Sequence, residues 1–219
     1  STYHLIRKNE VDLFQRSFKI AAICAAVFSL LIGIIGHQQA QHIVRSQPMK
    51  MAATEALWES EDPASFSVLT IHNPSTNSEI FSIRLPYALS FLAYNKFSGE
   101  VKGMNELQAE YEAKYGAGNY MPPSIIPYWA FRFMVGAGTL MVLLALYAIF
   151  VIYRKKLDNP DRIIKLLPLA LFLPYVGNTS GWLMTEVGRY PWVVFGLVKL
   201  EDGVSPTVTA GMLWVSLIG

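Results

Sequence analysis

The chain has 219 residues, of which 53% are hydrophobic and 16% are charged, and its formal net charge is +2. That composition is too apolar for an ordinary water-soluble domain, and the apolar residues are gathered in long runs. The pattern predicts an all-α integral membrane protein, in which a transmembrane helix bundle carries an extracytoplasmic loop domain. We expect the lipid bilayer as a partner and no nucleic acid.

Residues 1–16 are predicted to form the cytoplasmic end of a preceding helix and a loop. A bilayer core of about 30 Å needs roughly 20 helical residues, and three runs predict transmembrane helices: 17–36, 127–153 and 166–187. Prolines and glycines in the third run predict a kink. The run 208–219 predicts the start of a further transmembrane helix. Because the chain begins without Met and stops inside that run, we expect a fragment.

Basic residues flank the spans unevenly. They cluster before the first span and in 154–165, the loop between the second and third spans. Because Lys and Arg near span ends favour the cytoplasmic side, both flanks are predicted to be cytoplasmic. By alternation, the segments 37–126 and 188–207 lie together outside the cytoplasmic membrane, which predicts that any site joining them faces outward.

The segment 37–126 has an ordinary, varied composition, which predicts a folded cap and not a tether. Residues 48–60 are rich in helix formers and predict a helix that ends before Pro63. The β-branched and aromatic residues of 66–85 predict an extended or hairpin-like piece. A second short helix is predicted over 103–114, before a Gly-rich stretch.

Arg132 and Met134 lie near the outer end of the second span. A guanidinium inside a membrane costs at least a few kcal/mol unless it is paired or hydrated. Arg132 therefore needs an anionic partner such as a haem propionate, an acidic side chain or a lipid phosphate, or else it extends to the interface. Met134 is a soft ligand suited to haem iron, although methionine in an apolar helix more often serves packing.

Three other charged positions have alternative interpretations. Glu186 at the end of the third span is predicted to pair with Arg189, ligate a metal or relay protons. Lys50 and Glu55 are five residues apart, so they point about 140° apart around a helix. Solvated surface charge is their ordinary interpretation.

Three motifs together resemble subunit I of cytochrome bd-type quinol oxidases. They are Gln47-Pro48-Met49-Lys50-Met51-Ala52-Ala53-Thr54-Glu55-Ala56-Leu57-Trp58-Glu59, Phe131-Arg132-Phe133-Met134-Val135, and Gly181-Trp182 to Glu186-Val187-Gly188-Arg189-Tyr190-Pro191-Trp192. The resemblance covers essentially the whole chain, which corresponds to the C-terminal part of that subunit, with 37–127 similar to the shorter form of its quinol-binding loop. Tyr190 departs from the glutamine usual in the family.

The resemblance implies roles for seven residues. Lys50 and Glu55 match loop residues implicated in quinol binding and oxidation. Met134 matches an axial ligand of the low-spin haem b, and Arg132 the arginine beside that haem. Glu186 matches a ligand of a high-spin haem, and Trp182 and Arg189 match residues of the same neighbourhood. The family's histidine haem ligands lie on helices before Ser1, so the fragment alone should be inactive.

The resemblance also implies a function: electron transfer from membrane quinol, ubiquinol or menaquinol, through haem b to oxygen at a high-spin haem b and haem d site. Quinol would release its protons outside while oxygen reduction draws protons from the cytoplasm, which builds a proton gradient. The implied partners are a second oxidase subunit and a small accessory subunit in a bacterial inner membrane. The alternatives are a non-redox transporter or channel, with Arg132 and Glu186 lining a polar pathway, and a haem-free homologue.

Overall fold

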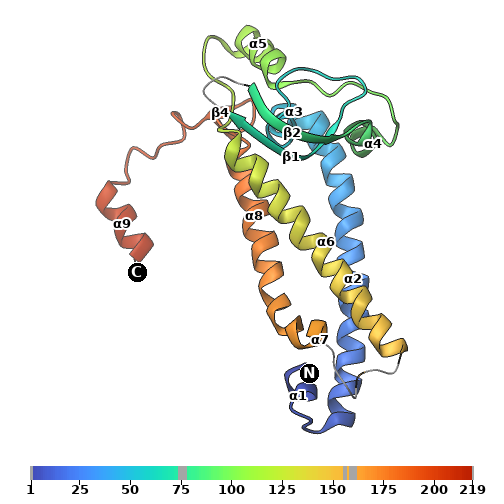
Figure 1. Cartoon of the computed structure of the whole chain (residues 1–219). Helices are drawn as coiled ribbons and strands as arrows, with labels where there is room; N and C mark the ends of the chain where they lie inside the picture. The colour runs from blue at the N-terminus through green and yellow to red at the C-terminus, as the bar shows by residue number, and fades with distance from the viewer. Residues whose placement is uncertain (1, 74–77, 155–156, 158–161, 219) are drawn as a thin grey trace.

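Three long helical segments run side by side beneath a folded cap (Figure 1). The computed structural model describes residues 2–73, 78–154, 157 and 162–218. The three segments are α2 (Val11–Ser46), α6 (Ile125–Tyr153), and a third that runs through α7 (Arg162–Leu166), the 3-10 helix η1 (Leu167–Phe172) and α8 (Leu173–Val187). Each is long and apolar enough to cross a membrane. The predicted helical membrane fold is confirmed.

The cap contains all four strands of the described chain. Its elements are α3 (Pro48–Glu55), β1 (Phe66–Asn73), β2 (Ser78–Leu85), α4 (Ala88–Tyr94), α5 (Met104–Tyr115), β3 (Trp192–Val194) and β4 (Val198–Lys199). β1 pairs with β2 and β3 with β4, both antiparallel. The predicted hairpin over 66–85 is therefore present, although its connecting residues 74–77 lie outside the described residues. The cap is formed by residues 47–124 together with the segment that follows α8. Two short helices lie apart from it: α1 (Thr2–Ile6) and α9 (Ala210–Ile218).

α2 is much longer than the apolar run 17–36 inside it. Its 36 residues span about 54 Å, which exceeds the bilayer core. The helix ends at Ser46 because Pro48 disfavours helical backbone at Gln47, whose φ is −141°. Pro48 then opens α3, where its missing N–H leaves no helical hydrogen bond unmade. One residue thus separates the membrane helix from the first helix of the cap.

The third segment, in which a kink was predicted, is interrupted by a 3-10 helix. Its 3-10 section η1 contains Pro168, and Pro174 lies in the first turn of α8, where proline is tolerated. α6 packs against both α2 and α8. In the predicted cytoplasmic loop 154–165, residues 155–156 and 158–161 lie outside the described residues.

The predicted helix over 48–60 is wrong at its C-terminal end, because α3 stops at Glu55. Ala56 adopts the left-handed conformation, with φ 49° and ψ 43°, and the N–H of Leu57 donates back to the carbonyl of Ala52 at 2.9 Å. This arrangement satisfies the last carbonyls of α3 and turns the chain away. Glu55 is thereby fixed at the end of a buried helix.

A hydrophobic cluster holds the cap together around α3. Ala52 and Ala53 have no exposed surface, and Met104 of α5 packs in the same cluster. The backbones approach closely at Gly103, where an added Cβ would lie 2.4 Å from the Glu59 carbonyl carbon. The cap is therefore a packed unit, in which alanines bury α3 and Gly103 lets the start of α5 approach the backbone that follows α3.

We predict that Gly103→Ala destabilises the cap by about 1–3 kcal/mol, because its new methyl group meets backbone that cannot move aside. Thermal denaturation of the purified protein measures the change. Gly118→Ala is the matched control, since its Cβ would make only ordinary contacts, at 3.6 Å or more, with Tyr120. Equal melting temperatures for the two variants would contradict the prediction.

Candidate functional site

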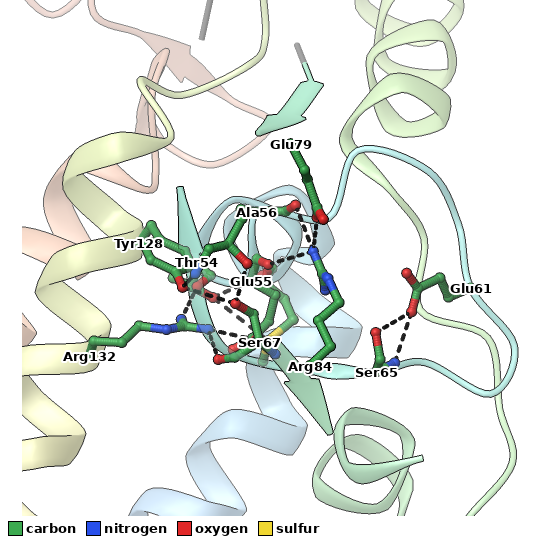
Figure 2. A network of polar contacts seen from close by, with 12 residues as sticks. Thr54, Glu55, Ala56, Glu61, Ser65, Ser67, Glu79, Arg84, Tyr128 and Arg132 are labelled. Atoms are coloured by element: carbon green, nitrogen blue, oxygen red, sulfur yellow. Dashed lines mark hydrogen bonds and ion pairs between the residues drawn. The ribbon is translucent and has the colours of Figure 1, made fainter. Parts of the chain in front are cut away.

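Glu55 and Arg132 form a buried ion pair between α3 and α6 (Figure 2). Glu55 Oε2 lies 3.0 Å from Arg132 Nη2 and accepts the backbone N–H of Ser67 at 2.9 Å. The two side chains are 1% and 12% exposed. Burial raises the pKa of Glu55, and Arg132 and the Ser67 hydrogen bond oppose that rise. The ordinary interpretation of Glu55 as a solvated surface charge is therefore wrong, whereas the anionic partner expected for Arg132 is present.

Arg132 joins three elements through one side chain. Its guanidinium also donates to the carbonyl oxygens of Thr54 in α3 and Ser67 in β1. It lies over the ring of Tyr128, 4.0 Å from the centroid, which adds a cation–π contact. α3, the β1–β2 hairpin and α6 are thus held in one polar network.

Tyr128 is a member of this network that the sequence did not reveal. It is fully buried, and its hydroxyl lies 2.9 Å from Ser67 Oγ and accepts the backbone N–H of Thr70. A tyrosine at the start of a membrane span ordinarily indicates an interfacial aromatic residue. Only the fold shows that Tyr128 faces the hairpin.

Arg84 of β2 is a second cation near Glu55 that sequence reasoning missed. Its Nη2 donates to the carbonyl of Ala56 at 3.2 Å, and the guanidinium is paired with Glu79 of the same strand (Figure 2). Arg84 therefore stabilises the left-handed turn that ends α3. Its charge also opposes the raised pKa of Glu55.

Lys50 is buried against the end of α8, so the ordinary interpretation as a solvated surface charge is wrong for this residue as well. Its Cγ lies 2.9 Å from the position that a Cβ would take on Gly188, which explains why glycine fits there. Burial lowers the pKa of Lys50, Arg189 lowers it further, and Glu186 acts in the opposite direction. α3 thus directs Lys50 toward α8 and Glu55 toward α6.

Met134 lies where α6 meets α8. Its Sδ is 2.9 Å from the position that a Cβ would take on Gly181, so a larger residue there would displace the thioether. Five residues after Gly181, Glu186 Oε2 accepts a hydrogen bond from Arg189 Nη2 at 2.5 Å. The predicted pairing of Glu186 with Arg189 is therefore present. Trp182 lies four residues before Glu186 and is 63% exposed.

Four polar atoms of these residues are buried without a hydrogen-bond partner in the described part of the chain: Glu55 Oε1, Arg84 Nη1, Arg132 Nε and Arg189 Nε. Buried polar groups are normally paired, so each unpaired atom calls for an explanation. The Glu55 atom is an acceptor in the cap, and the other three are cationic donors. Arg84 lies in the hairpin, Arg132 on α6 and Arg189 just after the end of α8. The acceptor suits a ligand hydroxyl at Glu55, and the two Nε donors suit anionic ligand groups at Arg132 and Arg189.

Comparison with known proteins decides the family. The sequence model described as cytochrome bd terminal oxidase subunit I matches residues 1–219. The chain belongs to this family. It is 48% identical over 219 residues to cytochrome bd ubiquinol oxidase subunit 1 of Bacillus subtilis, covering all of this chain and 47% of that one. It is also 26% identical to cytochrome bd-II ubiquinol oxidase subunit 1 of Escherichia coli, covering 53% of that chain.

The fold of the cytochrome bd subunit I chain agrees with this assignment. The bd oxidase structure from Geobacillus thermodenitrificans matches with a TM-score of 0.82 and 25% identity, covering 99% of this chain and 48% of that one. The chain therefore spans about half the length of the relatives it matches. Membership of this family, together with the three apolar helices, identifies a membrane protein. The alternative of an unrelated transporter or channel gains no support.

We predict that Arg132→Gln destabilises the protein by about 3–5 kcal/mol, because it leaves the buried Glu55 carboxylate without its partner. The double variant Arg132→Gln with Glu55→Gln should lose less than the sum of the two single variants, since no uncompensated charge remains. Denaturation of all four proteins measures this coupling. Strictly additive losses would contradict the ion pair.

Proposed function

We propose that the chain forms part of the haem-bearing subunit of a terminal quinol oxidase, which passes electrons from membrane quinol through haem b to oxygen at a high-spin haem site. The observation that carries the proposal is the buried Glu55, which has one carboxylate oxygen held by Arg132 and the other without a partner among the described residues. Arg132 lies two residues before Met134 on α6. A quinol bound at Glu55 would therefore be close to the haem ligand helix.

In this proposal, Glu55 is the base that accepts the quinol proton. A quinol hydroxyl would donate to the free Oε1, while Arg132 and the Ser67 N–H keep Oε2 in place. Burial favours the protonated carboxyl that results. Lys50 extends from the same helix toward α8, and its ammonium group would stabilise negative charge on a quinol oxygen that lies on that side.

The haem residues are proposed from their donor chemistry. The Met134 thioether suits a low-spin haem b and the Glu186 carboxylate a high-spin haem, either b or d. The unpaired Nε atoms of Arg132 and Arg189 would each donate to a propionate. The exposed indole of Trp182 would pack against the flat face of a haem beside Glu186. When bound, the haems supply one-electron carriers and the centre that reduces oxygen.

The proposed setting is a bacterial inner membrane, which the chain crosses several times. The cap would face outward and the loop 154–165 the cytoplasm, by the distribution of basic residues. Protons from quinol would then leave on the cap side, while those for oxygen reduction come from the cytoplasm, so that turnover builds a proton gradient. The whole enzyme would also require a second subunit and bind a small accessory subunit.

We predict that kcat/KM for quinol rises with pH through a pKa above that of an ordinary glutamate, because Glu55 accepts a proton only when ionised and its pKa is raised. Steady-state quinol oxidation by the whole oxidase at a series of pH values measures this. Glu55→Gln should lower the rate by about 10²–10⁴-fold and remove the rise. Glu59→Gln, an exposed glutamate four residues further along the chain, is the control. An unchanged pH profile in Glu55→Gln would exclude Glu55 as the base.

A second test addresses haem ligation. We predict that Met134→Leu removes the low-spin haem b bands from the reduced-minus-oxidised spectrum of the whole oxidase and keeps the high-spin bands. Met141→Leu makes the same substitution two turns further along α6 and should leave the spectrum unchanged. Absence of haem bands from the wild type would instead favour a haem-free homologue.

A further inference from the structure

The β1–β2 hairpin has its polar face inward and its apolar face outward. Its register pairs Leu69 with Ile83 and Ile71 with Phe81, which places these four side chains on one face because strand residues alternate. The pairs Ser67 with Arg84 and Thr70 with Ser82 form the opposite face. Bulges at Val68 and Ile80 preserve this separation of the two faces.

The polar face is the one that packs against the protein. Ser67 and Thr70 are fully buried, hydrogen-bond to each other at 2.7 Å and both contact the Tyr128 hydroxyl. Arg84 reaches the carbonyl oxygen of Ala56 from the same face. The interior of the molecule thus holds the polar half of the hairpin.

Three of the four side chains on the apolar face are exposed, and Leu69 is partly buried. Ile71 and Phe81 are each 51% exposed and Ile83 is 48% exposed. A hairpin with one face in water normally presents its polar side chains to the solvent. In this hairpin the polar side chains are buried and the apolar ones are exposed, which predicts that an apolar medium covers the outer face.

Two contacts fix the depth of this surface relative to the membrane helices. Ser67 and Thr70 lie against Tyr128 and Arg132, in the first two turns of α6 and at the start of its apolar run. Figure 1 shows the hairpin where the cap meets the long helices. The hairpin therefore lies at the level where α6 enters the apolar part of the bilayer.

The second contact involves the chain just after α4. Asn95 Oδ1 lies 2.8 Å from Nε2 of His37, the first residue after the apolar run of α2. Beside it, Phe91 and Phe97 stack with ring centroids 5.1 Å apart and are 42% and 69% exposed. These exposed aromatic rings thus lie at the membrane boundary of a second helix.

We propose that the outward face of the hairpin, together with Phe91 and Phe97, is embedded in the lipid leaflet on the cap side, with acyl chains covering Ile71, Phe81 and Ile83. Charge complementarity supports lipid as the occupant. Arg45, near the end of α2, and Lys96 line one surface hollow, which also contains Glu100, so that its lining has more positive than negative charge. Cations at that level would pair with lipid phosphates while the apolar side chains extend below them.

Spin labelling of the whole oxidase in lipid nanodiscs tests the proposal. Nitroxides attached to Ile71→Cys and Phe81→Cys, in a cysteine-free background, should collide with oxygen much more often than with a water-soluble nickel chelate. Ala113→Cys, at an exposed position of α5 on the side of the cap away from the long helices, is the control and should show the reverse preference. Retention of the haem spectrum verifies assembly.

Two results would overturn the proposal. Nickel access at Ile71 equal to that at Ala113 would place the hairpin face in water, and labels reached by neither reagent would show that protein covers it. If the cysteine variants do not assemble, Phe81→Trp provides a second measurement. Its fluorescence should be quenched by lipids brominated on their acyl chains beyond the quenching of the wild type, and no added quenching would also contradict lipid contact.

Discussion

The buried ion pair between Glu55 and Arg132 connects the cap to the membrane helices. Removing two charges from water is costly, and that cost is offset only when further hydrogen bonds satisfy both groups. Here the carbonyl oxygens of Thr54 and Ser67 accept from Arg132, and the N–H of Ser67 donates to Glu55. The pair therefore forms only when α3, β1 and α6 are in place together, which makes it a constraint on the whole arrangement.

α3 contacts both α6 and the end of α8 through its charged side chains. Its alanines let it pack closely inside the cap, and its two charged residues extend to different membrane helices. Glu55 meets Arg132, two residues before Met134, whereas Lys50 lies against Gly188, two residues after Glu186. In the proposed oxidase, one short helix would thus position the quinol residues relative to both haem-binding helices.

The membrane spans were predictable because hydropathy is a local property of about 20 residues. The burial of Lys50 and Glu55 was not, because their surroundings come from residues far along the chain: Arg132 is 77 positions after Glu55. The family resemblance selected both members of the ion pair but not their contact.

The hairpin shows a different limit of sequence reasoning. Its β-branched and aromatic residues predicted the strands, but alternation shows only that the two faces differ. Which face is buried depends on Tyr128 and Arg132, which hold the polar side. Tyr128 and Arg84 carried no signal in the sequence that separated them from ordinary interfacial or solvated residues.

The most direct test of the central claim is a structure of the complete oxidase with a quinone analogue bound. The analogue should place a ring oxygen within hydrogen-bond distance of Glu55 Oε1 while Oε2 remains paired with Arg132. A bound analogue far from Glu55, with the ion pair sealed inside protein, would contradict the assignment of this carboxylate to quinol oxidation and leave it a structural link between the cap and the membrane helices.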